Sequence, residues 1–72
     1  MTIKVERPSS ANYTPRSLML QYAKEHPEEV TADYGCVQYL IIGDRRYAYD
    51  HWCIENTAPG TDTITLHLVQ VL

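Results

Sequence analysis

Four side chains of this sequence could bind a metal ion or act as nucleophiles: Cys36, His51, Cys53 and His67. Side chains alternate between the two faces of a strand, and this parity places all four on one face of a predicted hairpin and its neighbouring strand. Two thiolates and two imidazoles are good zinc ligands, but structural zinc sites usually take ligands in close pairs from tight turns. Here only His51 and Cys53 are close. We therefore predict no metal and no other cofactor, and keep these four residues as the candidate ligands.

The same residues could form a nucleophilic pair, with Cys53 beside His51 or His67. No oxyanion hole, orienting carboxamide or substrate cleft is indicated, and the glycines at positions 35, 43 and 60 do not form a phosphate-binding loop. We therefore expect that the protein is not an enzyme. Cys36 would lie opposite Cys53 if the hairpin loop were residues 44–45, but cysteines of a cytosolic chain are usually reduced.

One helix and a few strands must position these residues. The alternation in residues 2–6 predicts a short strand, and residues 7–13 are typical of a loop. Thr14 and Pro15 predict a helix start, and Pro27 predicts a helix end near His26, with the last helical residue at about Glu25. Its apolar face is predicted to hold Leu18, Met19, Tyr22 and Ala23. Residues 28–34 are predicted to add one further helical turn.

The rest of the chain predicts β-structure. Residues 36–42 and 46–54 are rich in β-branched and aromatic side chains and flank a tight-turn sequence at 43–45. Residues 56–62 are expected to be a loop and residues 63–72 the last strand. The prediction is therefore an α+β fold of order β-α-β-β-β, with one helix packed on a three- to four-stranded antiparallel sheet. Residues 1–72 are expected to form a single compact domain.

The predicted hairpin is apolar on both faces, and this is the main functional clue in the sequence. Parity assigns one face to the core: Val37, Tyr39, Ile41, Ala48, Trp52, Ile54, Ile64, Leu66 and Leu68. Asp50 is the one misfit on that face. The opposite face is predicted to hold Cys36, Gln38, Leu40, Ile42, Tyr47, Tyr49, His51, Cys53, Thr65, His67, Val69 and Val71. This second face is too apolar for water alone, unless the N-terminal strand and residues 7–13 fold over it.

Tyr-rich mixed faces are typical of protein interfaces, and the chain has six Tyr but no Phe. We therefore expect a small non-enzymatic protein-binding module. It would be a regulator or inhibitor of the kind that bacteriophages and mobile elements encode, and would bind another protein or itself as a homodimer. Aromatic and Arg side chains usually carry binding energy, which favours Leu40, Ile42, Tyr47 and Tyr49 as the anchor, with Arg45 and Arg46 as a charged rim.

Two other functions have some support. Arg45 and Arg46 beside Tyr47 and Tyr49 would suit single-stranded nucleic acid, with arginine for phosphate and tyrosine for stacking, but the net charge of −3 opposes this. A zinc-stabilised accessory subunit is the third possibility. No apolar run approaches the roughly 20 residues of a membrane-spanning helix, and the N-terminus is polar. We expect a cytoplasmic protein without membrane contact.

Overall fold

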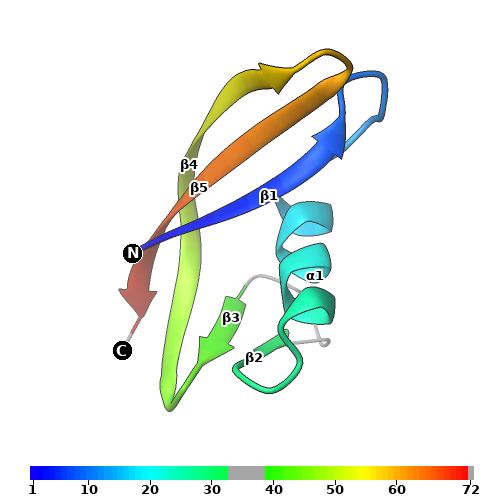
Figure 1. Ribbon diagram of the computed structural model, residues 1–72. Helices are drawn as coiled ribbons and strands as arrows, with labels where there is room; N and C mark the ends of the chain where they lie inside the picture. The colour runs from blue at the N-terminus through cyan, green and yellow to red at the C-terminus, as the bar shows by residue number, and fades with distance from the viewer. Residues whose placement is uncertain (33–38, 72) are drawn as a thin grey trace.

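The computed structural model describes residues 1–32 and 39–71. In these ranges the chain forms one helix and one antiparallel sheet of five strands, with spatial order β1-β5-β4-β3-β2 (Figure 1). The elements are β1 (Thr2–Pro8), α1 (Pro15–Glu25), β2 (Val30–Ala32), β3 (Tyr39–Ile42), β4 (Arg45–Ala58) and β5 (Thr61–Val71). The predicted α+β class is confirmed. The sheet, however, has more strands than the three to four expected.

Local sequence explains the bounds of α1. The Thr14 hydroxyl accepts a hydrogen bond from the Ser17 backbone N–H (3.2 Å), and the Ser17 hydroxyl accepts one from the Thr14 N–H (2.8 Å). This reciprocal cap satisfies two of the amide groups that a helix start leaves free. The His26 N–H donates to the Tyr22 carbonyl and closes the last turn. The predicted start, end and buried face of the helix are confirmed, since Leu18, Met19 and Ala23 are buried and Tyr22 packs against the core.

The further helical turn predicted for residues 28–34 is wrong where the structure describes it. Val30–Ala32 forms the short edge strand β2, which pairs antiparallel with β3 and places Val30 opposite Ile42. The β-branched side chains of Val30 and Thr31 suit a strand better than a helix, and Val30 is buried in this pairing. Residues 33–38 lie outside the described ranges, and with them the predicted positions of Cys36, Val37 and Gln38.

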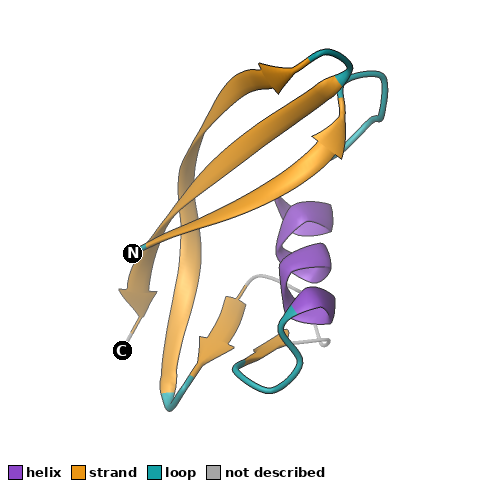
Figure 2. Ribbon diagram, viewed as in Figure 1, coloured by secondary structure: helices purple, strands orange, loops and turns teal. Residues whose placement is uncertain are grey.

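The hairpin of β4 and β5 is longer than the sequence indicated. Most of the loop predicted at 56–62 is strand, and only Pro59 and Gly60 turn the chain. Gly60 has a φ of +79°, a left-handed conformation that glycine adopts without steric cost. As a result β4, β5 and β1 extend well beyond the N-terminal end of α1 (Figure 2). Ile54 lies in this extension on the helix side and is 47% exposed.

The core lies between α1 and one face of the sheet. Its buried members are Ile3, Val5, Leu18, Met19, Ala23, Val30, Leu40, Ile64, Leu66 and Leu68. On β5 these are alternate residues, as expected for a strand with one buried face. Trp52 packs against this cluster and makes edge-to-face contacts with Tyr13 and Tyr49, at ring-centroid distances of 5.7 and 6.3 Å.

Asp50 interrupts the regular alternation of β4. Tyr49 pairs with Leu68 and His51 pairs with His67, so Asp50 is an extra residue without an opposite partner in β5. Such a β-bulge moves every side chain on one of its sides to the other face. Tyr47 and Tyr49 therefore share the core side with Trp52, although their sequence parity differs. In the hairpin of β3 and β4, Tyr39 pairs with Ala48, so odd residues of β3 lie opposite even residues of β4.

Because of the bulge, the observed faces of the sheet differ from the predicted ones. The assignment was wrong for Leu40, Ile42, Tyr47 and Tyr49, which lie on the core side, and for Tyr39, Ile41 and Ala48, which lie on the opposite side. It was right for Trp52, Ile54, Ile64, Leu66 and Leu68. The N-terminal strand does not fold over the second face, because β1 pairs edge to edge with β5.

Candidate binding face

The side of the sheet turned away from α1 is here called the open face. Its side chains form rows across the strands, because paired residues of neighbouring strands point to the same side. From the hairpin turn upward the rows are Ile41–Arg46–Val71, Tyr39–Ala48–Val69, His51–His67–Thr2, Cys53–Thr65–Lys4 and Glu55–Thr63–Glu6. The character of the face changes along them, from apolar beside the turn to polar at the far end.

The first two rows form an apolar surface, called the Tyr39 patch. Its members are Tyr39, Ile41, Arg46, Ala48, Val69 and Val71. Val69 is 49% exposed, one of three large apolar side chains with such exposure in the described residues. The guanidinium carbon of Arg46 lies 5.3 Å from the centroid of the Tyr39 ring, within the range of a cation–π contact. An apolar patch with one exposed and three half-buried aliphatic side chains beside a paired Tyr and Arg has the composition that concentrates binding energy in interfaces.

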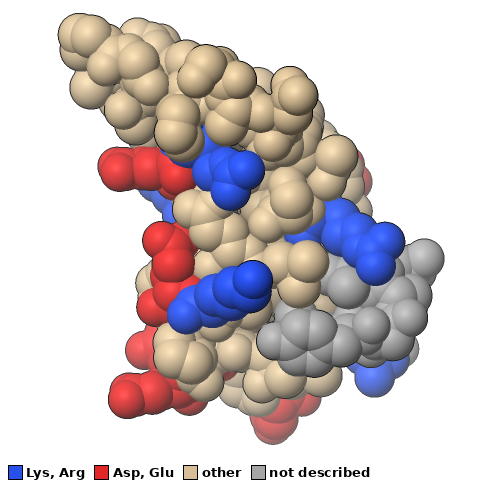
Figure 3. Space-filling model, turned by 90° about the vertical axis from the view of Figure 1, so that its right-hand side faces the viewer, with Lys and Arg blue, Asp and Glu red and all other residues tan. Residues whose placement is uncertain are grey.

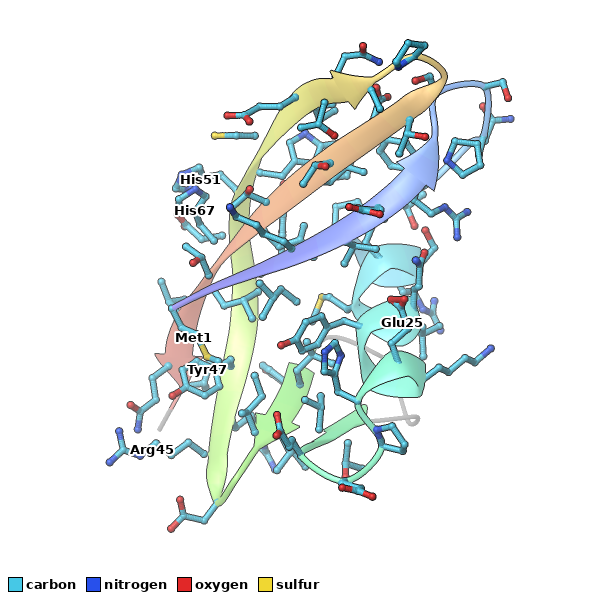
Figure 4. The ribbon with its side chains drawn as sticks, in the orientation of Figure 1. Met1, Glu25, Arg45, Tyr47, His51 and His67 are labelled. Carbon is cyan, nitrogen blue, oxygen red and sulfur yellow. The ribbon has the colours of Figure 1, made fainter. Side chains whose placement is uncertain are left out.

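The middle of the open face carries three of the residues that could do chemistry. The rings of His51 and His67 stack with centroids 4.2 Å apart and planes 7° from parallel, and Cys53 Sγ lies 3.9 Å from His67 Nε2. The Asp50 carboxylate contacts His51 Nδ1 at 2.6 Å. Figure 4 shows both labelled imidazoles on the side of β4 and β5 away from α1. Their predicted common face is confirmed.

No group of three or more His, Cys, Asp or Glu side chains in residues 1–32 and 39–71 is arranged, as it stands, to hold a metal ion. The near-parallel stack explains this, because the nitrogen lone pairs of His51 and His67 lie in their ring planes and do not converge. Cys36, the fourth candidate ligand, is outside those ranges. The two last rows, which contain Lys4, Glu6 and Glu55, are polar and suit contact with water.

The residues predicted to anchor a partner lie elsewhere. Leu40 is 0% exposed, and Ile42, Tyr47 and Tyr49 pack against the core from the helix side. These positions cannot present a continuous apolar surface on the open face. Tyr39, Ile41 and Ala48 lie on the open face instead. The one signal of this in the sequence was Asp50, because a charged residue did not fit the core face to which parity assigned it.

The two arginines at the hairpin end lie where they were predicted. Gly43 and Asp44 form the turn, and Arg45 and Arg46 begin β4, so the two side chains leave the strand on opposite sides. Only Arg46 belongs to the open face, while Arg45 projects from the lower end of the hairpin (Figure 4). The predicted stacking platform of Tyr47 and Tyr49 is therefore not beside Arg46. This geometry gives no support to binding of single-stranded nucleic acid.

The surface formed by α1 differs from the open face. Its exposed residues include Arg16, Lys24 and Glu25. Figure 3 views this side and shows Lys and Arg side chains near the middle, with Asp and Glu side chains gathered along one margin. This mixture of both charges is typical of a helix face in contact with water. No helix in the described part of the chain is long and apolar enough to cross a membrane.

No protein-family model matches the chain, and no match was found to a curated protein or to a solved structure. The functional argument therefore depends on the surfaces of the protein itself. Of these, the open face combines apolar exposure with a local cluster of His and Cys side chains.

Proposed function

We propose that the protein is a non-enzymatic binding module that docks another protein onto the Tyr39 patch, as a small regulator or inhibitor. The observation that carries this proposal is Val69, a large aliphatic side chain that is 49% exposed near the C-terminal end of β5. Tyr39 and Ala48 complete its row, and no described helix covers the face on which they lie. A partner that covered the patch would remove this apolar area from water, at about 25 cal/mol per Å².

The composition of the open face supports a defined footprint. The centre of a protein interface is usually apolar and aromatic with Arg, and its rim is polar. The Tyr39 patch matches such a centre, while the rows that contain Lys4 and Glu6 match a rim. Arg46 would favour a partner that places a carboxylate or a backbone carbonyl beside its apolar surface, because a guanidinium forms strong hydrogen bonds with such groups.

Val69→Asp is expected to abolish partner binding without unfolding the protein. The change places a charge within the Tyr39 patch, where a bound partner would have to desolvate it. The matched control is Thr65→Asp, on the same strand and the same face but among the polar rows, and it should bind as the native protein does. Both variants should retain the native circular dichroism spectrum.

The measurement has two stages. A tagged native protein is used to capture and identify a partner from its host, and the purified partner is then titrated with each variant. We expect at least a hundredfold loss of affinity for Val69→Asp and less than threefold for Thr65→Asp. Sedimentation of the protein alone shows whether a second copy is the partner. Equal binding by the two variants would exclude the Tyr39 patch as the docking surface.

A further inference from the structure

We propose that His51, Cys53 and His67 form a surface zinc site with three protein ligands and an open fourth position. The three residues come from two neighbouring strands, with His51 and Cys53 two positions apart on β4 and His67 directly opposite His51 on β5. Two imidazoles and a thiolate favour zinc over magnesium or calcium, which prefer oxygen ligands. The site does not depend on the docking function proposed above.

Two of the ligand atoms already lie at nearly the required separation. Zinc binds sulfur at about 2.3 Å and imidazole nitrogen at about 2.0–2.1 Å, so a tetrahedral ion holds the two ligand atoms roughly 3.6 Å apart. Cys53 Sγ and His67 Nε2 are 3.9 Å apart. The separation of these two atoms therefore needs to change by only a few tenths of an ångström.

The third ligand requires a change in one side chain. His51 lies flat on His67, so its lone pair runs parallel to that of His67 rather than toward a common point. A tilt of the His51 ring would bring its Nε2 toward the ion. The His51 side chain is 60% exposed, so packing does not oppose this movement. The stack that it gives up is an exposed contact between two side chains, which contributes little to stability.

Asp50 determines which His51 nitrogen is free to bind an ion. Its carboxylate lies 2.6 Å from His51 Nδ1, which assigns the ring proton to that nitrogen and leaves Nε2 free for the ion. A carboxylate that accepts a hydrogen bond from the other ring nitrogen of a metal-binding histidine orients the ring and raises its basicity. The bulge that displaces Asp50 from the regular pairing is what places this carboxylate beside the ring. The position of Asp50 thus has a role that the fold alone does not require.

The test is a titration of the reduced, untagged full-length protein with Co²⁺, a spectroscopic substitute for zinc, followed by competition with Zn²⁺. We expect one ion per chain and a near-ultraviolet absorption from thiolate-to-cobalt charge transfer, displaced by Zn²⁺. Cys53→Ser should remove this absorption. His51→Ala and His67→Ala should each weaken binding at least tenfold. Asp50→Asn should weaken it by about tenfold, because His51 loses the carboxylate that holds its Nδ1.

The chain supplies matched controls. His26 is the remaining histidine and stacks on Tyr22 away from the open face, with ring centroids 4.1 Å apart, so His26→Ala should bind as the native protein does. Val69→Asp separates this site from the docking surface. Both variants should keep the charge-transfer absorption. A native protein that lacks this absorption, or an absorption that survives Cys53→Ser, would overturn the proposed site.

Discussion

Leu40→Asp is expected to unfold the protein, whereas Ile41→Asp, one position along the same strand, should leave it folded. Leu40 is 0% exposed and belongs to the core cluster. Loss of a buried leucine side chain costs about 2–5 kcal/mol, and an unpaired buried carboxylate adds to this cost. A domain of this size has a free energy of unfolding of only a few kcal/mol.

Ile41 lies on the open face and is only partly buried, so the expected loss for Ile41→Asp is about 1 kcal/mol, from weaker cross-strand packing. Circular dichroism and urea unfolding of the two variants measure the difference. The face assignment would be contradicted if Ile41→Asp were unfolded without urea while the unfolding midpoint of Leu40→Asp stayed at the urea concentration of the native protein.

Deletion of Asp50 is expected to preserve the fold. Asp50 is the extra residue between the Tyr49–Leu68 and His51–His67 pairs, so its removal makes the pairing of β4 with β5 continuous. Tyr49 and Trp52 stay on the core side and His51 stays on the open face, because each keeps its present partner. We expect a free energy of unfolding within about 2 kcal/mol of the native value, reflecting the altered local twist.

Deletion of Ala48, two residues away, is the matched control and should abolish folding. The bulge can absorb this deletion, so Tyr47 and β3 keep their faces, but Tyr49 then moves to the open face opposite Val69. Asp50 takes its place on the core side opposite Leu68, where an unpaired carboxylate is costly. Nuclear magnetic resonance spectra of the two deletion variants give the comparison, with dispersed amide signals expected only for the Asp50 deletion. If the Ala48 deletion folded and the Asp50 deletion did not, the position of the bulge would be wrong.

The helix could be predicted from the sequence because local chemistry determines its bounds. Thr14 and Ser17 cap it, Pro15 occupies the first turn, and Pro27 prevents its continuation. The apolar spacing of Leu18 and Met19 similarly determines the buried side. None of these features requires knowledge of the rest of the fold.

The faces of the hairpin could not be predicted in the same way. Parity holds only while a strand is regular, and a single extra residue reverses it for every residue beyond. The misfit at Asp50 was visible in the sequence, but a charge at a sheet margin and a charge at a bulge look alike there. Strand β2 and the extension of β4 to Ala58 also depend on pairing with other strands, since β2 has only three residues and Asn56 has no strand preference of its own.

The common face of His51, Cys53 and His67 could therefore be predicted from the sequence, whereas the β3 and β4 residues of the Tyr39 patch could not. His51, Cys53 and His67 all lie on one side of the bulge, so parity correctly placed them together. Tyr39 and Ile41 lie beyond it, so the same rule assigned them to the core. Of the residues proposed to dock a partner, Tyr39, Ile41 and Ala48 are brought to the open face by the bulge, whereas Val69 and Val71 were predicted there by parity.

The central claim is that the Tyr39 patch is on the surface while Leu40 is in the core. Methyl nuclear magnetic resonance with a soluble paramagnetic agent tests it most directly, because relaxation rises with exposure to solvent. Methyl signals of Ile41 and Val69 should relax strongly, and those of Leu40 and Leu66 should change little. Strong relaxation of Leu40 with protection of Ile41 would reverse the two faces of β3 and contradict the account.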